Sequence, residues 1–97
     1  MTLTEGQVEE YETRHREIWP EMLEAITRCG YTNYTLFRAG QTVVGYAECV
    51  PNVETAASLM NAEPVTARWN ESFQGVIEVA PATGGFSIPL TSIWHLE

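Results

Sequence analysis

The chain has 97 residues, a length that suits one small domain, and 44% of them are hydrophobic, which is enough to bury a core. Its net charge of -8 is carried by Glu and Arg alone, without Asp or Lys, and it disfavours binding to nucleic acid or anionic membranes. No apolar run approaches the roughly 18 to 20 residues that a membrane span needs. We expect residues 1–97 to form a single soluble domain.

The missing residue types exclude several kinds of site. Without Lys there is no Schiff-base lysine and no P-loop, and without Asp there is no Asp-based triad or EF-hand loop. Two Cys and two His lack the close paired spacings of a tetrahedral metal site. We therefore expect chemistry without a metal or a cofactor. The first residues show no signal-peptide pattern, so we expect a cytoplasmic protein.

A helical pattern opens the chain after a short extended stub, Met1 to Thr4. Apolar or aromatic side chains then recur at intervals of three and four, at Val8, Tyr11, His15, Ile18, Trp19, Met22, Leu23 and Ile26. Pro20 lacks a backbone N–H and disfavours helical geometry at Trp19, which predicts two helices or one bent helix. Gly30 suits the end of the second helical segment.

A hairpin is predicted next. The residues from Tyr31 to Arg38 alternate, with Thr32, Tyr34 and Leu36 on one side and Tyr31, Asn33, Thr35 and Phe37 on the other. A turn at 39–41 leads into a second strand from Thr42 to Val50.

The second half of the chain is predicted to form two helices and a strand. Asn52 is a candidate cap for a helix from Val53 to Met60, and Pro64 is a candidate first residue of a helix that reaches Val76. A final strand is predicted from Ser87 to Leu96, with Pro89 indicating an edge or a bulge near its start.

The element order is stub, helix, strand, strand, helix, strand, which is the split βαβ repeat of an α+β, ferredoxin-like sandwich if the stub is a truncated first strand. The helices then cover one face of the sheet only. Because so short a chain has no further element to cover the other face, we expect a homodimer that closes a dimeric α/β barrel.

Six side chains are candidates for chemistry: Tyr11, His15, Tyr34, Tyr46, Trp69 and His95. Tyr11 and His15 lie four residues apart on one helical face, where a histidine is more often a core residue than a catalyst. Tyr34 points either toward the helices or toward the opposite sheet face. Trp69 is either a core residue or a stacking platform for a ligand, and His95 is a surface residue of an edge strand. Imidazole, phenol and indole groups together suit a neutral polyol ligand.

The segment from Tyr11 to Glu21 has the pattern Y-x-x-x-H-x-x-I-W-P-E, and Gly30 and Asn33-Tyr34 follow it. With Arg68-Trp69 and the closing Trp94-His95-Leu96, the chain resembles the L-rhamnose mutarotase family over nearly its whole length. The family's Arg-Trp-Trp stands here as Arg68-Trp69-Asn70, and the family's full first strand is reduced to the stub.

The resemblance implies a dimeric barrel of ferredoxin-like subunits that interconverts the α and β anomers of L-rhamnose without metal or cofactor. It places the acid/base histidine at His15 and the sugar-contacting tyrosines at Tyr11 and Tyr34. It also implies that Trp69 and Asn70 face the monosaccharide. We expect His15 to give a proton to the ring oxygen.

Two other functions stay open at the level of sequence. One is a cofactor-free monooxygenase of the same fold, which would need an apolar pocket for a planar substrate. Tyr11, His15 and Tyr34 are too polar for such a pocket. The other is a non-catalytic sugar-binding or regulatory domain, which sugar binding without rate enhancement would identify.

Overall fold

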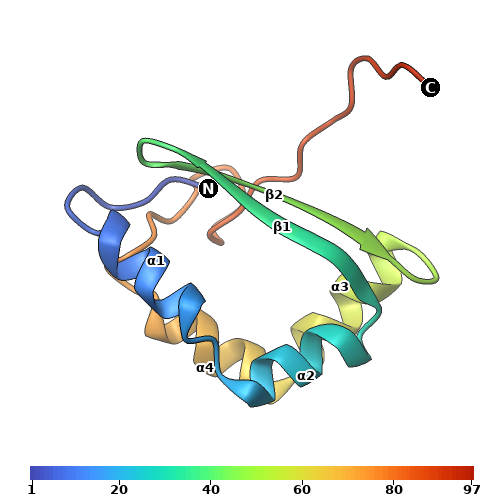
Figure 1. The fold of residues 1–97 in the computed structure, drawn as a ribbon, viewed down its shortest axis with the longest axis horizontal. Coiled ribbons are helices and arrows are strands. Elements are labelled where there is room, and N and C mark those ends of the chain that lie inside the picture. The colour runs from blue at the N-terminus through green and yellow to red at the C-terminus, as the bar shows by residue number, and fades with distance from the viewer.

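The computed structural model describes residues 1–97, and it places four helices in an arc beneath one antiparallel hairpin (Figure 1). Helix α1 spans Val8–Arg16 and helix α2 spans Pro20–Arg28. Pro20 is the first residue of α2, and Trp19 before it is extended. The predicted interruption at Pro20 is therefore confirmed as a break between two helices.

Gly30 joins α2 to the hairpin at a point where two backbone segments touch. Its φ is +101°, and a Cβ there would lie 2.1 Å from the carbonyl oxygen of Val50. The Val50 N–H donates to the Gly30 carbonyl at 2.9 Å. Only glycine combines this left-handed conformation with so close an approach.

The hairpin consists of β1, Tyr31–Ala39, and β2, Thr42–Cys49, paired antiparallel as predicted. The stub lies beside β2, because the Val43 N–H donates to the Met1 carbonyl at 2.9 Å. On the other side of the stub, the Glu78 N–H donates to the Thr2 carbonyl at 2.8 Å. Across the sheet the order is residues 76–78, the stub, β2 and β1. This is the order of a ferredoxin-like sheet in which the first strand (the stub) and the fourth strand (76–78) are reduced to a few residues.

Helix α3 spans Val53–Ala62 and helix α4 spans Pro64–Ser72. The Asn52 side chain accepts from the Thr55 N–H at 2.8 Å, which confirms the predicted cap. The prediction that the last helix reaches Val76 is wrong. The chain turns after Ser72, because residues 76–78 pair with the stub instead.

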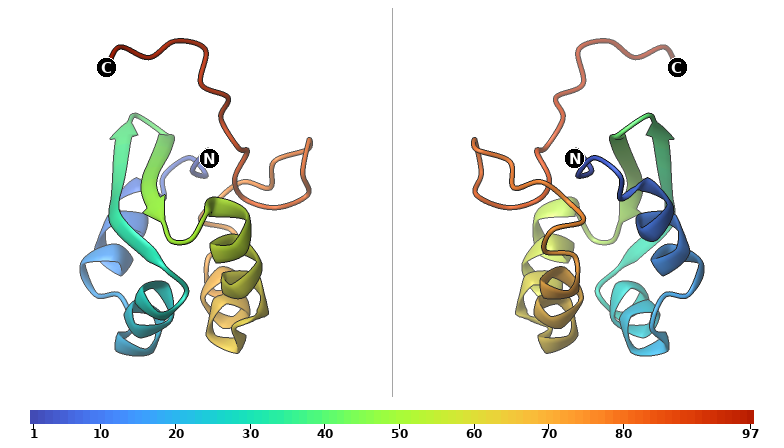
Figure 2. Two further views of the ribbon diagram at one scale, coloured as in Figure 1. Left: turned by 90° about the vertical axis from the view of Figure 1, so that its right-hand side faces the viewer. Right: turned by 90° about the vertical axis from the view of Figure 1, so that its left-hand side faces the viewer.

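The predicted final strand from Ser87 to Leu96 is also wrong. These residues form no regular element and extend away from the body of the molecule (Figures 1 and 2). Residues 76–78 pair with the stub in the position of the fourth strand, and the tail pairs with no strand of its own chain. The apolar side chains of the tail are exposed to solvent: Ile93 is 95% exposed and Trp94 is 77% exposed.

The core lies between the hairpin and the helices, with α1 and α2 on one side and α3 and α4 on the other (Figure 2). It contains Leu3, Val43, Val65, Trp69 and Phe73, and the opposite face of the hairpin is exposed. Only 14 of the 97 residues are buried, so the single chain covers little of its own apolar surface. The helices have nine or ten residues each, and none of them could span a membrane.

The contact at Gly30 predicts a large loss of stability on substitution. Gly30→Ala combines a strained φ with a clash against Val50, and we expect it to lower the free energy of unfolding by about 2 to 3 kcal/mol. Gly40→Ala is the matched control, because Gly40 also has a positive φ but meets nothing within 4 Å. It should cost about 1 kcal/mol. Urea unfolding measures both, and equal losses would contradict this account.

Candidate active site

A cavity of about 530 Å³ brings together the five site residues that the family resemblance implies. Tyr11 and His15 come from α1, Tyr34 comes from β1, and Trp69 and Asn70 come from α4. Side chains of α2, the end of α3 and the segment 85–87 complete the wall. The volume is in the range of small-molecule sites. Residues from opposite halves of the chain therefore meet at one place.

His15 lies in the last turn of α1 with one ring nitrogen engaged. Its Nδ1 lies 2.9 Å from the carbonyl oxygen of Tyr11. A carbonyl can only accept, so the proton sits on Nδ1 and the neutral ring keeps a lone pair on Nε2. Burial lowers the pKa of His15, and the hydrogen bond to the Tyr11 carbonyl opposes this effect. The neutral ring, a proton acceptor at Nε2, is the main form at pH 7.

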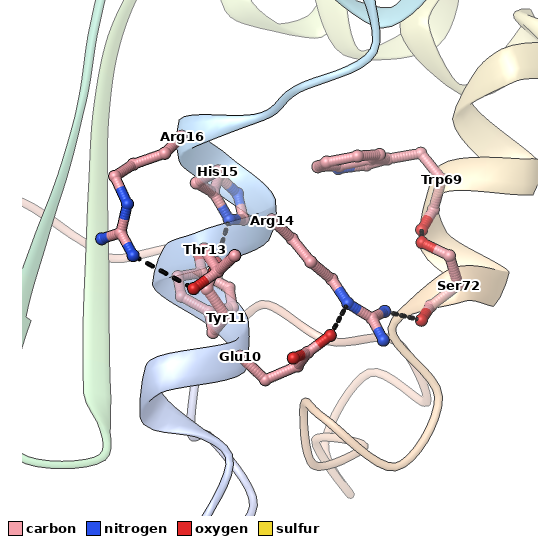
Figure 3. Close-up of polar contacts among 8 residues, drawn as sticks. All are labelled: Glu10, Tyr11, Thr13, Arg14, His15, Arg16, Trp69 and Ser72. Carbon is pink, nitrogen blue, oxygen red and sulfur yellow. Dashed lines mark hydrogen bonds and ion pairs between the residues drawn. The ribbon is translucent and has the colours of Figure 1, made fainter.

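Arg14, next to His15 in the sequence, links α1 to the end of α4 (Figure 3). Its guanidinium donates to the carbonyl of Ser72 and lies 5.3 Å from the centre of the Phe73 ring. The Ser72 hydroxyl in turn donates to the Trp69 carbonyl at 2.6 Å. Beside this link, the rings of His15 and Trp69 meet edge to face, with centroids 5.6 Å apart.

Trp69 forms both a part of the core and a wall of the cavity, so its two sequence interpretations are compatible. The side chain is 9% exposed, and its ring packs edge to face against Trp19 at 5.0 Å and Phe73 at 4.8 Å. Asn70 follows it as an exposed residue at the margin of the cavity. An indole face and an amide next to each other suit a sugar, which has both C–H and O–H surfaces.

The two tyrosines supply hydroxyl groups that stay protonated. Tyr11 is 4% exposed, and burial, together with the nearby Tyr34, raises the pKa of Tyr11 to about 12. Its ring lies against that of His15, tilted by 34°, with centroids 4.2 Å apart. Tyr34 is half exposed and lines the same cavity. Both phenols can therefore donate hydrogen bonds to a ligand at neutral pH.

The predicted alternation of side chains in β1 is wrong at Tyr31. Tyr31 was expected opposite Tyr34, yet the two rings stack with centroids 5.7 Å apart and both line the cavity. The strand pairing shifts between Thr32 and Thr35, which is a β-bulge. Tyr34 lines the cavity on the same side as Leu36, as the alternation predicts, and the bulge brings Tyr31 to that side as well.

Sequence reasoning missed Thr66 and Phe86, which also line the cavity. Thr66 lies three and four residues before Trp69 and Asn70, so helical spacing could have identified it. Its buried hydroxyl has no hydrogen-bond partner. Phe86 belongs to a segment without periodicity, and no sequence signal pointed to it. His95, in contrast, lies in the extended tail and does not line the cavity.

Comparison with known proteins matches this chain to one family. The profile of a family described as L-rhamnose mutarotase matches residues 1–96. The chain belongs to the L-rhamnose mutarotase family. An L-rhamnose mutarotase of Lachnoclostridium phytofermentans is 34% identical over 97 residues, covering 100% of this chain and 93% of the relative. One from Oceanobacillus iheyensis is 31% identical over 99 residues, with the same coverage of both chains.

The fold agrees with L-rhamnose mutarotase membership. The crystal structure of an L-rhamnose mutarotase from Formosa agariphila superimposes with a TM-score of 0.80 at 22% identity, covering 100% of this chain and 93% of that one. Membership of the L-rhamnose mutarotase family makes the protein an isomerase that acts on a sugar.

The lowered pKa of His15 predicts how stability depends on pH. An unfolded chain has a histidine pKa of 6.5, so the folded state binds fewer protons below that pH. The contribution of neutral His15 to the free energy of unfolding is therefore fully present above pH 6.5, and it is lost as the pH falls through the pKa of His15 in the folded state. We expect urea unfolding of the wild type to show this loss, and His15→Gln to show a shallower pH dependence. Identical pH dependences would contradict the buried neutral imidazole.

Proposed function

We propose that the protein interconverts the α and β anomers of L-rhamnose inside the 530 Å³ cavity, with His15 as the acid/base group. The observation that carries this proposal is the convergence of the family's motif residues on that cavity. Tyr11, His15, Tyr34 and Trp69 are dispersed in the sequence but line one space. Family membership supplies the reaction, and the geometry supplies the roles.

The reaction requires two proton movements on oxygens bonded to the same carbon. Nε2 of neutral His15 takes the proton of the anomeric hydroxyl, and the imidazolium then gives it to the ring oxygen as the C1–O5 bond breaks. The open aldehyde rotates about the C1–C2 bond and recloses on its other face by the reverse steps. One C–O bond breaks and reforms without change of oxidation state, so the chemistry itself demands no redox group or metal.

The remaining side chains hold the sugar in place. The protonated hydroxyls of Tyr11 and Tyr34 donate to sugar oxygens, and the Trp69 ring packs against a C–H surface. Asn70, in the position of the family's second tryptophan, offers an amide at the margin of the cavity. The match over residues 1–96 favours neither the monooxygenase nor the non-catalytic alternative.

A homodimer is part of the same proposal. The bare face of the hairpin carries Phe37, Val44 and Tyr46, which are 59%, 41% and 53% exposed. The tail adds exposed Leu90 and Trp94. Exposed apolar side chains in this number are unusual for an isolated monomer, and a second copy offers the same surfaces in return. Sheet against sheet, with each tail lying on the other copy, would bury them.

Removal of the imidazole tests the role of His15. We expect His15→Gln to lower the catalysed exchange rate by about 10²- to 10⁴-fold, because the acid/base group is lost. The measurement is NMR saturation transfer between the anomeric protons of L-rhamnose, with L-fucose and D-glucose compared in parallel. His95→Gln is the matched control and should keep full activity. A folded His15→Gln protein with wild-type exchange would contradict the assignment.

The dimer is tested by placing charge on the bare sheet face. Phe37→Glu combined with Val44→Glu should convert a dimer into a monomer, because desolvating two carboxylates outweighs the apolar contact. Sedimentation velocity at micromolar concentration gives the mass of each species. Glu54→Gln, an exposed change on α3, is the control and should stay dimeric. A monomeric wild-type protein would overturn the dimer.

A further inference from the structure

The bulge in β1 brings Tyr31 to the inner face of the hairpin. Tyr34 and Leu36 lie two residues apart and share that face by ordinary alternation. From Thr32 to Thr35 the strand β1 advances three residues while the paired residues of β2 advance two, so β1 contains one extra residue. In an unbroken strand Tyr31 would lie on the opposite face from Tyr34, yet both residues line the cavity.

Asn33 adopts the backbone conformation of this bulge. Its φ is +46°, in the left-handed region that Asn tolerates better than most residues. The Asn33 side chain donates from Nδ2 to Oε2 of Glu48 across the hairpin. The family pattern includes Asn33 and Tyr34 but does not include Tyr31. The extra residue therefore adds to the cavity a tyrosine that the pattern does not contain.

The ring of Tyr31 is held in place while its hydroxyl is free. The ring packs against the core and stacks on the ring of Tyr34, with centroids 5.7 Å apart and planes inclined by 29°. No hydrogen bond within the chain engages the Tyr31 hydroxyl. Thr66 has the only buried side-chain polar atom without a partner, so the Tyr31 hydroxyl reaches accessible space. A fixed ring with a free hydroxyl is suited to contact a ligand.

The Tyr31 hydroxyl joins two other protonated phenols. Burial, and then nearby Cys49 and Tyr34, raises the pKa of Tyr31, so its hydroxyl can donate at neutral pH. Tyr34 also contributes, after burial, to the raised pKa of Tyr11, whose ring lies against His15. The Tyr34 hydroxyl is therefore near both other phenols. Three hydroxyl donors extend from the side of His15 along the wall that α1 and β1 form.

We propose that Tyr31 is a further substrate-binding residue: its hydroxyl and that of Tyr34 bind two neighbouring hydroxyls among those on C2, C3 and C4 of the sugar. The inference rests on the proposed function for the placement of the anomeric carbon at His15. A pyranose carries these hydroxyls on adjacent carbons, and two stacked phenols from one strand offer two adjacent donors. Tyr31 thereby contributes to the choice of sugar.

Tyr31→Phe tests the hydroxyl alone, because it keeps the ring and its stacking on Tyr34. We expect the Kd for L-rhamnose to rise by about 3- to 10-fold, the effect of one hydrogen bond. KM should rise with it while kcat stays nearly unchanged, because Tyr31 does not act on the reacting atoms. Calorimetry with anomerically equilibrated sugar measures binding without net reaction. Tyr46→Phe is the matched control, since Tyr46 does not line the cavity, and should match wild type.

Deoxy sugars identify the hydroxyl that Tyr31 binds. Calorimetry with the 2-, 3- and 4-deoxy analogues of L-rhamnose gives a Kd for the wild type and for Tyr31→Phe. For one analogue, the loss of the sugar hydroxyl and the loss of the Tyr31 hydroxyl should not add, because both remove the same hydrogen bond. For the other two analogues the losses should add. A purely structural role of Tyr31 would give additive losses with all three.

The outcomes separate this inference from the proposed function. Wild-type protein that shows no anomer exchange, but binds L-rhamnose more tightly than Tyr31→Phe does, overturns the proposed function and supports the role of Tyr31 in binding. Active wild type and a folded Tyr31→Phe with an unchanged Kd overturn only the role of Tyr31, and so do additive losses with all three analogues. Wild-type protein that binds none of these sugars overturns both claims.

Discussion

The aromatic cluster in which Tyr11 and His15 of α1 meet Trp69 of α4 and Phe73 is the contact on which the rest of the structure depends. Arg14 reaches the end of α4, and His15 meets Trp69 edge to face at 5.6 Å. The same contact closes the core of a chain with few buried residues and forms the wall of the cavity. Stability and catalysis therefore draw on the same aromatic cluster, and a change that loosens the two helices should harm both.

The sequence predicted the elements that depend on local chemistry and missed those that depend on pairing. Pro20 and Asn52 act on their own backbone, so the helix break and the cap followed from them. Residues 87–96 have the alternation of a strand, but alternation alone does not supply a partner strand, and residues 76–78 pair with the stub instead. The alternation within a segment cannot show which of two segments pairs with the stub.

The candidate site was predicted only in part, for a similar reason. Helical spacing places Tyr11 beside His15, and the family resemblance joined Tyr34 and Trp69 to them. The bulge was not foreseeable, because Asn33 fits an alternating strand as well as a left-handed conformation. Asn33 is hydrogen-bonded across the hairpin to Glu48, and sequence patterns within one strand do not contain that partner.

The central claim is that one cavity between the hairpin and the helices binds and converts L-rhamnose. The measurement that tests it most directly is a crystal structure of the protein with L-rhamnose bound. The account predicts the sugar in the 530 Å³ cavity, with its anomeric and ring oxygens within hydrogen-bond distance of Nε2 of His15 and its C–H surface on Trp69. A sugar bound elsewhere, or with its anomeric carbon turned away from His15, would contradict it.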